Sequence, residues 1–291
     1  MAAHPRWFAR DNSRVSTEQP QEQLDTANAE FWAELCGSRL ARAEGVEDAS
    51  AESLVRFDRA FWDTYPYLER YLPWSSGERL LEIGLGYGTV GKWLAERGLD
   101  YHGLDISPGP VGMMVHRLEM LGVDGAPTRV KQGSALAIPH PDESFDVVVS
   151  IGCLHHTGDL AKAIEEVRRV LRTGGQAMVM VYNSHSYRRA VMLPVQMLLR
   201  GAWRDPLRRA EFVRVTYDAD AEGTAAPATE FTSVAQIRRL FADFSEVRVR
   251  RENFDDFVLN VGGRHPSISR TAFLNNIARI AGLDLYITAT K

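Results

Sequence analysis

The chain has 291 residues, a formal net charge of -4 and two cysteines. Its charges are spread along the sequence without a basic block, which argues against a nucleic-acid partner. The two cysteines are far apart in the sequence, so the sequence indicates neither a disulfide framework nor a zinc site with spaced ligands. The N-terminal segment holds no apolar stretch long enough for a signal peptide, and the sequence has no run of about 18 apolar residues, so we expect a cytoplasmic protein without stable membrane insertion.

The N-terminal quarter is predicted to be a flexible segment followed by helices. Residues 1–25 are polar and lack sustained periodicity, which indicates a flexible lead-in that can still fold over a ligand. In residues 26–75, apolar and aromatic side chains recur at roughly helical spacing, and this predicts two or three helices. We therefore expect a helical cap on the core.

Residues 76–291 are predicted to form one α/β domain. Short apolar runs predict buried strands, and these are RLLEIG, DYHGLD, TRVKQG, FDVVVS, GGQAMVMVY, EVRVRRE and LDLYITAT. Amphipathic stretches predict helices, and these are VGKWLAERG, GPVGMMVHRLEMLG, LAKAIEEVRRVLRTGG, SVAQIRRLFADF and SRTAFLNNIARIAG. Strands that alternate with helices indicate a parallel sheet with right-handed crossovers.

Residues 183–230 interrupt this alternation. They begin with the basic amphipathic SYRRAVMLPVQMLLRGAWR and end in the small-residue loop DADAEGTAAPATEF. A long loop in a compact domain is usually functional or disordered, so we predict a lid over the active site, with a surface insertion as the alternative. Its apolar part favours an apolar acceptor or a membrane-surface contact, and a buried lid or a homodimer helix explains it equally well.

A glycine-rich turn, LEIGLGYGTVGKWLAERG, follows the first predicted strand of this domain. Such a turn directs the free N–H groups of the next helix at a ligand, which suits a nucleotide cofactor. Gly86, Gly88 and Gly91 satisfy the dinucleotide pattern GxGxxG, whereas Glu82, Gly84, Gly86 and Gly88 satisfy ExGxGxG. The dinucleotide register would bury Glu82 and Gly84 inside the strand, so the second register is favoured.

Four segments follow one another along the chain and carry its most recognisable motifs. They are LLEIGLGYGTV, LDIS, GSALAIPHPDESFDVVVSIGCLHHT and AIEEVRRVLRTGGQAMVMVYN. In this order the chain resembles the class I S-adenosylmethionine-dependent methyltransferases from about Glu78 to Asn183, in particular the methyltransferase type 11 group that includes ubiquinone-biosynthesis enzymes. The resemblance implies a Rossmann-like, seven-stranded, mostly parallel sheet with an antiparallel last strand. It also implies S-adenosylmethionine as the cofactor and a small-molecule acceptor, such as a secondary metabolite, methylated on oxygen or nitrogen.

The resemblance also implies the residues that bind the cofactor. Glu82 and the glycine turn would hold the methionine end, Asp105 the ribose hydroxyls, and Ile106 the adenine. Ser134 stands where the family often has an acidic residue, so its adenine contact would lack charge assistance. The predicted cofactor-binding residues are Glu82, Gly84, Leu85, Gly86, Gly88, Asp105, Ile106, Gly133, Ser134, Ala135 and Ile151.

The segment SIGCLHHTGD follows the fourth predicted strand of the sheet, where open α/β sheets bind their ligands. His155 and His156 are the candidate catalytic residues, because an imidazole can abstract a proton near neutral pH. In an extended segment only one of the two would face the substrate, and we expect His155→Ala to lower turnover. Helix capping is the alternative, and a metal site with Cys153 matches no familiar ligand spacing.

Three tyrosines are the candidate substrate-binding residues, namely Tyr65, Tyr182 and Tyr187. Ring faces of Tyr65 and Tyr182 would attract a sulfonium cation, and Tyr187, with the following Arg188 and Arg189, would meet an anionic acceptor. Core packing, or a solvated helix face, is the alternative for each. Other reactions also stay open: aminocarboxypropyl transfer or cyclisation that releases methylthioadenosine, cofactor sensing, and nicotinamide-dependent oxidoreduction.

Overall fold

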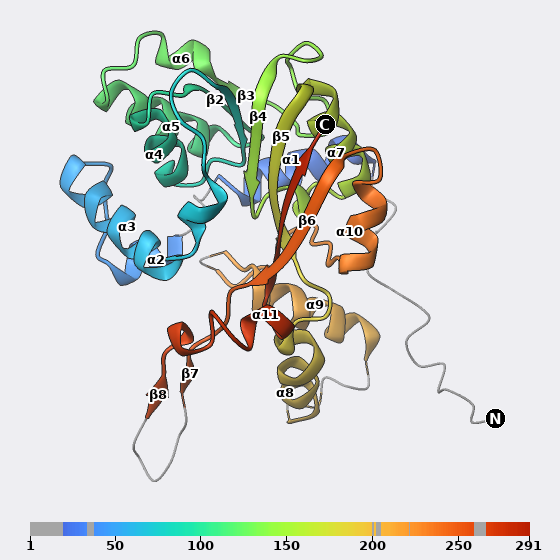
Figure 1. Ribbon diagram of the computed structural model, residues 1–291. Coiled ribbons are helices and arrows are strands. Elements are labelled where there is room, and N and C mark those ends of the chain that lie inside the picture. Colours follow the sequence, from blue (N-terminus) through green and yellow to red (C-terminus); the bar gives the residue numbers. More distant parts are fainter. Residues whose placement is uncertain (1–19, 34–37, 200, 202–204, 221, 259–265) are drawn as a thin grey trace.

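The computed structural model describes residues 20–33, 38–199, 201, 205–220, 222–258 and 266–291, and a seven-stranded sheet forms its centre (Figure 1). The strands are β1 (Arg79–Ile83), β2 (Asp100–Asp105), β3 (Val130–Gln132), β4 (Phe145–Ile151), β5 (Leu171–Tyr182), β6 (Ser245–Glu252) and β9 (Asp284–Thr290). Their order is β3-β2-β1-β4-β5-β9-β6. β1 to β5 pair in parallel, and β9 runs antiparallel to both β5 and β6. The predicted mostly parallel sheet with an antiparallel last strand is confirmed.

Helices cover both faces of the sheet, because successive strand residues point to opposite sides. Leu80 of β1 belongs to a buried cluster with residues of α4 (Thr89–Glu96) and α5 (Pro108–Met120). Leu81, the next residue, belongs to a second cluster with residues of α7 (Leu160–Val170) and α10 (Val234–Leu240). A short helix, α6 (Ala126–Arg129), precedes β3. The sheet is therefore held between two apolar layers.

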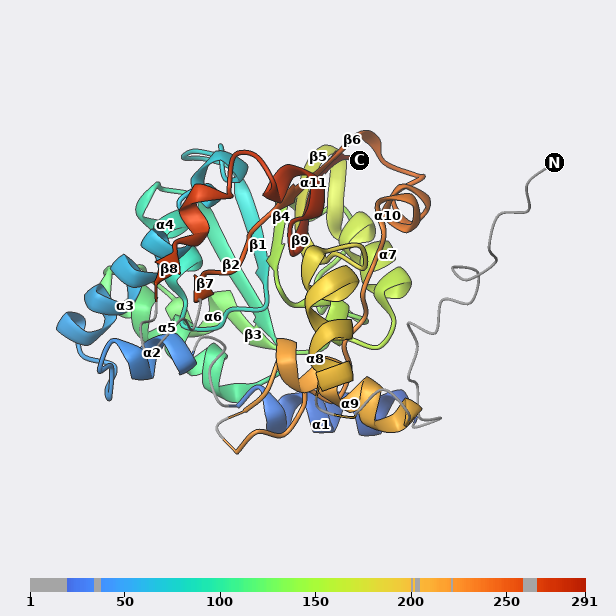
Figure 2. The same ribbon diagram turned by 90° about the horizontal axis from the view of Figure 1, so that it is seen from below.

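The N-terminal helices reach the end of the sheet at which the parallel strands have their carboxyl ends. They are α1 (Gln21–Phe31), α2 (Ser38–Ala43), α3 (Ala51–Thr64) and the 3₁₀ turn η2 (Leu68–Tyr71). α1 begins inside the segment 1–25 that we predicted as flexible, and the part of that segment up to residue 19 lies outside the described residues. In both views α2 and α3 lie on the side of α4 and α5 (Figures 1 and 2).

Side-chain hydrogen bonds attach α1 across the ends of two strands. The Asn28 amide donates to the carbonyl of His156, which follows β4, over 2.9 Å. The Ser107 hydroxyl, which follows β2, donates to the carbonyl of Ala29, also over 2.9 Å. α1 therefore bridges the carboxyl ends of β2 and β4.

The insertion at residues 183–230 contains a π-helical turn, η4 (Arg188–Met192), and the helices α8 (Leu193–Leu199) and α9 (Pro206–Tyr217). We did not predict α9. Its N-terminus carries a recognisable signal, because the Asp205 carboxylate caps the backbone N–H groups of Leu207 and Arg208, and Pro206 occupies the first helical turn.

The C-terminal part differs from the prediction in two places. The single helix expected over SRTAFLNNIARIAG is a 3₁₀ turn, η6 (Arg270–Ala272), and a short helix, α11 (Ala278–Ala281). Asn276 lies between them, and its amide donates to the carbonyl of Ala272, a local bond that competes with a continuous helix. A two-stranded hairpin of β7 (Phe257–Val258) and β8 (Ser267–Ile268) was not predicted and projects from the domain (Figure 1). Among the helices that the structure describes, none has the length and hydrophobicity to cross a bilayer.

Candidate functional site

The glycine turn after β1 is tightly packed against the end of β4. Gly84 has a φ of +86°, and a Cβ atom at this position would lie 2.9 Å from the Cys153 sulfur. A side chain here would therefore be strained in its backbone and would clash with Cys153. The chain turns at Gly84 with its backbone exposed to the space above the sheet.

Packing against neighbouring side chains explains why residue 91 is a glycine, and no ligand contact is needed to explain it. A Cβ atom at Gly91 in α4 would lie 2.5 Å from the Tyr101 hydroxyl oxygen and 2.6 Å from Glu82 Oε2. Gly88 is the N-cap of α4, and a Cβ atom there would lie 2.8 Å from Arg117 Cδ. The last glycine of the dinucleotide pattern is thus a helix–sheet packing residue.

Asp105 holds the glycine turn to the end of β2. One carboxylate oxygen accepts the backbone N–H of Leu85 over 2.8 Å, and the other accepts that of Ser107 over 2.9 Å. Burial raises the pKa of Asp105, while these backbone hydrogen bonds oppose the rise. The carboxylate is buried yet lies on the cavity wall, and its remaining lone pairs are available to hydroxyl donors.

Glu82 is a second buried carboxyl at the end of the neighbouring strand. Its Oε2 accepts the Tyr101 hydroxyl over 2.5 Å. Burial raises the pKa of Glu82 to about 8, the Tyr101 hydrogen bond lowers it, and the charge of Asp105 raises it further. A nearby cation would favour the ionised form of Glu82.

A cavity of about 470 Å³ opens at the carboxyl ends of β1, β2 and β4. The predicted cofactor residues that line it are Glu82, Gly84, Leu85, Gly86, Asp105, Ile106, Gly133, Ser134, Ala135 and Ile151. Gly88 is the predicted cofactor residue that is not part of the wall. The volume lies in the range of small-molecule and cofactor sites.

Residues of the cap and of the insertion complete the cavity wall. α1 and its C-cap contribute Asp25, Asn28, Phe31 and Trp32, and the end of α9 with the loop after it contributes Tyr217, Asp218, Ala219 and Asp220. We did not predict any of these eight residues as site residues. They lie outside the four recognisable segments and carry no motif, so only tertiary structure brings them to the site.

The two histidines after β4 lie in different environments. His156 lines the cavity, and its Nδ1 donates to the carbonyl of Ala228 over 2.7 Å. Its Nε2 lies 3.7 Å from Asp218 Oδ2. Because Nδ1 faces a carbonyl, it carries the proton, and a neutral His156 presents the lone pair of Nε2.

His155 does not have the geometry of a catalytic residue. It is fully buried, does not belong to the described cavity wall, and its ring lies 4.1 Å from that of Tyr182. Burial lowers the pKa of His155 well below its usual value, so the ring stays neutral. The geometry therefore favours His156 over His155 as the candidate catalytic residue.

The three tyrosines predicted to bind the substrate do not all lie at the cavity. Tyr65 and Tyr182 line the cavity, and the Tyr182 hydroxyl donates to Asp218 Oδ1 over 2.9 Å. Tyr187 lies away from the cavity, where its ring stacks on Phe254 at 4.1 Å and its hydroxyl donates to Asp255. Tyr187 therefore does not line the described cavity wall, and its predicted contact with an acceptor stays a prediction.

Arg188 and Arg189 are also absent from the described cavity wall. The Arg188 guanidinium pairs with Asp255, over 3.0 Å from Nε, and lies over the Tyr217 ring. Arg189 lies over the Phe231 ring, 4.0 Å from its centroid. Neither arginine therefore lines the described wall, although Arg188 lies against the wall residue Tyr217.

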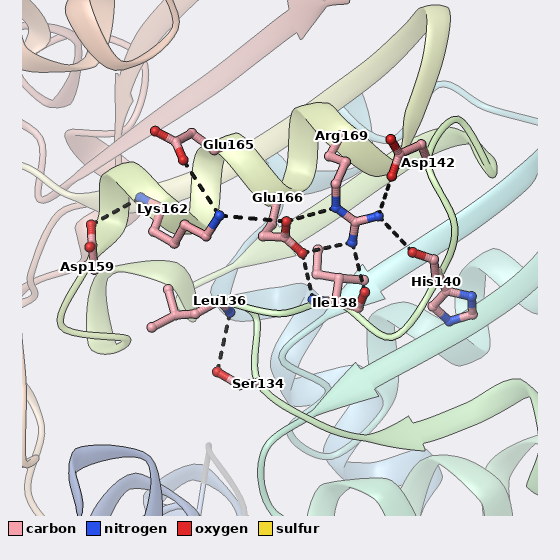
Figure 3. Close-up of polar contacts among 10 residues, drawn as sticks. All are labelled: Ser134, Leu136, Ile138, His140, Asp142, Asp159, Lys162, Glu165, Glu166 and Arg169. Carbon is pink, nitrogen blue, oxygen red and sulfur yellow. Dashed lines mark hydrogen bonds and ion pairs between the residues drawn. The ribbon is translucent and has the colours of Figure 1, made fainter. Parts of the chain in front are cut away.

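The loop that carries Ser134 is fastened to α7 by Arg169 (Figure 3). The Arg169 guanidinium donates to the carbonyls of Ile138 and His140 and to the Glu166 carboxylate, each over 2.8 Å. Glu166 in turn accepts the backbone N–H of Ile138 over 2.8 Å. This network therefore attaches to α7 the segment that follows the wall residues Ser134 and Ala135.

We expect Arg169→Met to lower the free energy of unfolding by about 2 kcal/mol, because it leaves the Ile138 carbonyl and the Glu166 carboxylate with fewer donors. Urea unfolding would measure this change. Arg168→Met on the same helix is the control, since among the described residues Arg168 makes one side-chain hydrogen bond, to the Asp243 carbonyl at the surface, and it should cost about 0.5 kcal/mol. Equal losses in the two variants would contradict a special role for Arg169.

Comparison with known proteins identifies the central part of the chain. Residues 81–179 match the family model described as a methyltransferase domain. A ubiquinone biosynthesis O-methyltransferase from Alkalilimnicola ehrlichii is 28% identical over 162 residues, which cover 53% of this chain and 64% of that protein. Three other curated methyltransferases are matched over only 26%, 38% and 36% of their own length.

Two solved structures share the fold. A methyltransferase from Thermotoga maritima, described as a possible histamine N-methyltransferase, has a TM-score of 0.55 at 18% identity and covers 91% of this chain and 99% of its own. A phosphoethanolamine N-methyltransferase 2 from Haemonchus contortus, solved with phosphomonomethylethanolamine and S-adenosylhomocysteine, has a TM-score of 0.50 at 20% identity and covers 79% of this chain and 52% of its own. The predicted resemblance to methyltransferases is confirmed.

Proposed function

We propose that this chain, whose residues 81–179 carry a methyltransferase domain, transfers the methyl group of S-adenosylmethionine to an oxygen or nitrogen of a small molecule. The observation that carries the proposal is the cavity at the strand ends, where a bare glycine turn and two buried carboxyls meet. The S-adenosylhomocysteine bound to the similar structure from Haemonchus contortus supports the choice of cofactor.

The residues of the cavity fit this cofactor. Glu82 would hold the methionine ammonium group, the backbone around Gly84 its carboxylate, and Asp105 the ribose hydroxyls. Ile106 and Ser134 would lie at the adenine. The cofactor supplies a methyl group that its sulfonium already activates, so the protein has to align the acceptor and exclude water.

His156 is proposed to take the proton that an acceptor loses. Its Nδ1 is held by the Ala228 carbonyl, so its Nε2 is free to accept a proton at the cavity wall. The Asp218 carboxylate, 3.7 Å from Nε2, would stabilise the imidazolium that forms. The carbonyl thus fixes the tautomer, and the carboxylate lies beside the nitrogen that would receive the proton.

Product analysis tests the proposed reaction. The protein would be incubated with S-adenosylmethionine and a panel of amines, alcohols and phenols, and the nucleoside products separated by mass spectrometry. S-adenosylhomocysteine is the expected product. Methylthioadenosine as the only nucleoside product would contradict methyl transfer and favour aminocarboxypropyl transfer or cyclisation.

Thermal shift assays test the cofactor separately. S-adenosylhomocysteine should raise the melting temperature, because a ligand that binds only the folded state stabilises it. The nicotinamide dinucleotide NAD is the control and should leave the melting temperature unchanged. Stabilisation by NAD alone would contradict the proposed cofactor.

We expect binding of S-adenosylhomocysteine to tighten as the pH rises from 6 to 8, by up to about tenfold per pH unit. The Glu82 carboxyl, with a pKa of about 8 in the ligand-free protein, is largely protonated at pH 7. A bound ammonium group would favour its ionised form, so binding should release a proton. Calorimetry at pH 7 in two buffers of different ionisation enthalpy would measure the release.

Glu82→Gln is the matched variant for this experiment. The amide cannot lose a proton, so the dependence of the affinity on pH should disappear between pH 6 and 8. Because burial raises the folded-state pKa of Glu82, ionisation also lowers the free energy of unfolding of the ligand-free protein as the pH rises from 4.5 to about 8. An unchanged proton release in Glu82→Gln would assign the effect to another group.

The remaining sequence predictions stay within this proposal. We propose residues 26–75 as a cap and 183–230 as a lid, because both contribute residues to the cavity wall. The cytoplasmic location and the absence of a nucleic-acid partner remain predictions. Val195, Leu198 and Leu199 of α8 are exposed apolar residues, which is consistent with a homodimer, and light scattering of the purified chain would test it.

A further inference from the structure

The cavity wall carries negative charge. Its acidic residues are Asp25, Glu82, Asp105, Asp218 and Asp220, and among the described residues of the wall there is no lysine or arginine. Glu82 and Asp105 belong to the proposed cofactor site. Asp220 is engaged in its own turn, because its carboxylate accepts the backbone N–H groups of Glu222 and Thr224. The Asp25 carboxylate accepts the side-chain amide of Gln21, so Asp218 is the acidic residue of the wall that lies beside His156.

Two buried oxygen atoms in this wall accept no hydrogen bond from the described residues. They are Asn28 Oδ1 and Asp218 Oδ2. Asn28 is only 3% exposed, and its amide nitrogen is already committed to the His156 carbonyl, so the amide oxygen is the group that lacks a partner. A buried acceptor without a donor is unfavourable, and a ligand that donates an N–H or O–H group would relieve it.

Both oxygen atoms belong to side chains that contact His156. Asn28 binds the backbone carbonyl of His156 over 2.9 Å, and Asp218 Oδ2 lies 3.7 Å from its Nε2. The other Asp218 oxygen accepts the Tyr182 hydroxyl, which fixes the carboxylate. The two unpaired acceptors and the proposed base are therefore parts of one cluster, which we call the acceptor cluster and define as Asn28, His156, Tyr182 and Asp218.

Aromatic rings surround the acceptor cluster. The Trp32 ring lies 4.8 Å from the His156 ring, the Tyr182 ring 5.9 Å from it, and the Tyr217 ring 5.0 Å from that of Tyr182. All of these residues line the cavity. Aromatic faces attract cations, and the attraction grows when water is excluded.

We infer that the methyl acceptor is a primary or secondary amine that binds as a cation and donates N–H groups to Asn28 Oδ1 and Asp218 Oδ2. This inference rests on the proposed function and specifies its substrate class. An ammonium group offers several donors and a positive charge, which match two unpaired acceptors, a carboxylate and aromatic faces. An alcohol offers one donor, and a carboxylate or phosphate would be repelled by Asp218.

The same cluster accounts for the proton balance. The ammonium group gives one proton to His156 Nε2 and becomes a neutral amine. The amine nitrogen then uses its lone pair to form a bond to the methyl carbon while the carbon–sulfur bond breaks and its electron pair stays on sulfur. The methylated ammonium product carries the positive charge that the sulfonium loses.

Matched probes test the substrate class on the full chain saturated with S-adenosylhomocysteine. Calorimetry at pH 7.5 would compare phenethylamine, 2-phenylethanol and phenylacetate, and then butylamine, butanol and butyrate. We expect at least one amine to bind tenfold or more tighter than its matched alcohol, and neither carboxylate to bind. Binding of no amine, or of an alcohol or carboxylate at least as tightly as its amine, would overturn the inference. Failure of S-adenosylhomocysteine itself to bind would instead overturn the proposed function.

Two acid-to-amide variants separate the acceptor cluster from the overall charge. Asp218→Asn keeps the shape of the side chain and removes its charge, so amine affinity should fall tenfold or more while S-adenosylhomocysteine affinity stays unchanged. Glu222→Gln removes the same charge from an exposed position of the same loop outside the described wall, and amine affinity should not change. Equal losses in both variants, or no loss in Asp218→Asn, would overturn the inference.

Discussion

Replacing Asp105 by Ala should weaken binding of S-adenosylhomocysteine about 100-fold or more. The variant removes the carboxylate proposed to hold both ribose hydroxyls, and hydrogen bonds to a charged group contribute about 1.5–3 kcal/mol each. It also frees the backbone N–H groups of Leu85 and Ser107, which the carboxylate holds at 2.8 and 2.9 Å. The glycine turn would lose its attachment to β2, so calorimetry should show the largest loss of affinity at this position.

Asp100→Ala is the matched control for this result. Asp100 lies at the opposite end of the same strand, where it pairs with Arg129 and lies beside the first residue of β1 rather than the glycine turn at its end. Its Ala variant should bind S-adenosylhomocysteine as the original chain does. An affinity loss of less than about threefold in Asp105→Ala, with circular dichroism unchanged, would contradict the proposed ribose site.

The sheet was predictable because its strands are short apolar runs between polar turns. Seven such runs correspond to the seven strands of the sheet, and the carboxyl ends of the first, second and fourth carry the predicted carboxyls and histidines. The choice of the ExGxGxG pattern over the GxGxxG pattern was also predictable, from the position of the glycines relative to the end of the first strand. Gly91 packs against Tyr101 and Glu82, as expected for a helix residue close to a strand.

The difference between His155 and His156 was not predictable from a strand pattern. We assumed an extended segment, whereas the two histidines end a 3₁₀ turn, η3 (Leu154–His156). In this turn their rings lie 4.1 Å apart rather than on opposite sides. Which ring faces the cavity is decided by the distant loop after α9, whose Glu230 binds the His155 carbonyl and whose Ala228 binds the His156 ring.

The cap and the insertion illustrate the same limit. Asn28 and Asp218 both contact His156. Asn28 precedes it by 128 residues in the chain, and Asp218 follows it by 62. Neither side chain stands in a motif or in a periodic pattern that distinguishes it from a surface residue. Their contribution to the site depends on tertiary contacts that local sequence does not encode.

Replacing His156 by Gln should lower kcat about 100-fold or more and leave S-adenosylhomocysteine affinity within about twofold. The amide cannot accept the proton that Nε2 of His156 is proposed to take, and a positioned general base typically contributes 10²–10⁴-fold in rate. The glutamine side chain retains a donor for the Ala228 carbonyl, so the wall of the cavity should stay in place. Initial rates with an acceptor from the amine panel would give kcat, and calorimetry would give the affinity.

His155→Phe provides the comparison within the same turn. Both ring nitrogens of His155 are buried without hydrogen-bond partners among the described residues, so an aromatic ring without polar atoms should cost little stability and leave kcat within about twofold. The pair of variants therefore distinguishes a base at the cavity wall from a packing residue behind it. If His155→Phe loses as much turnover as His156→Gln while both bind S-adenosylhomocysteine normally, the assignment of the base to His156 is wrong.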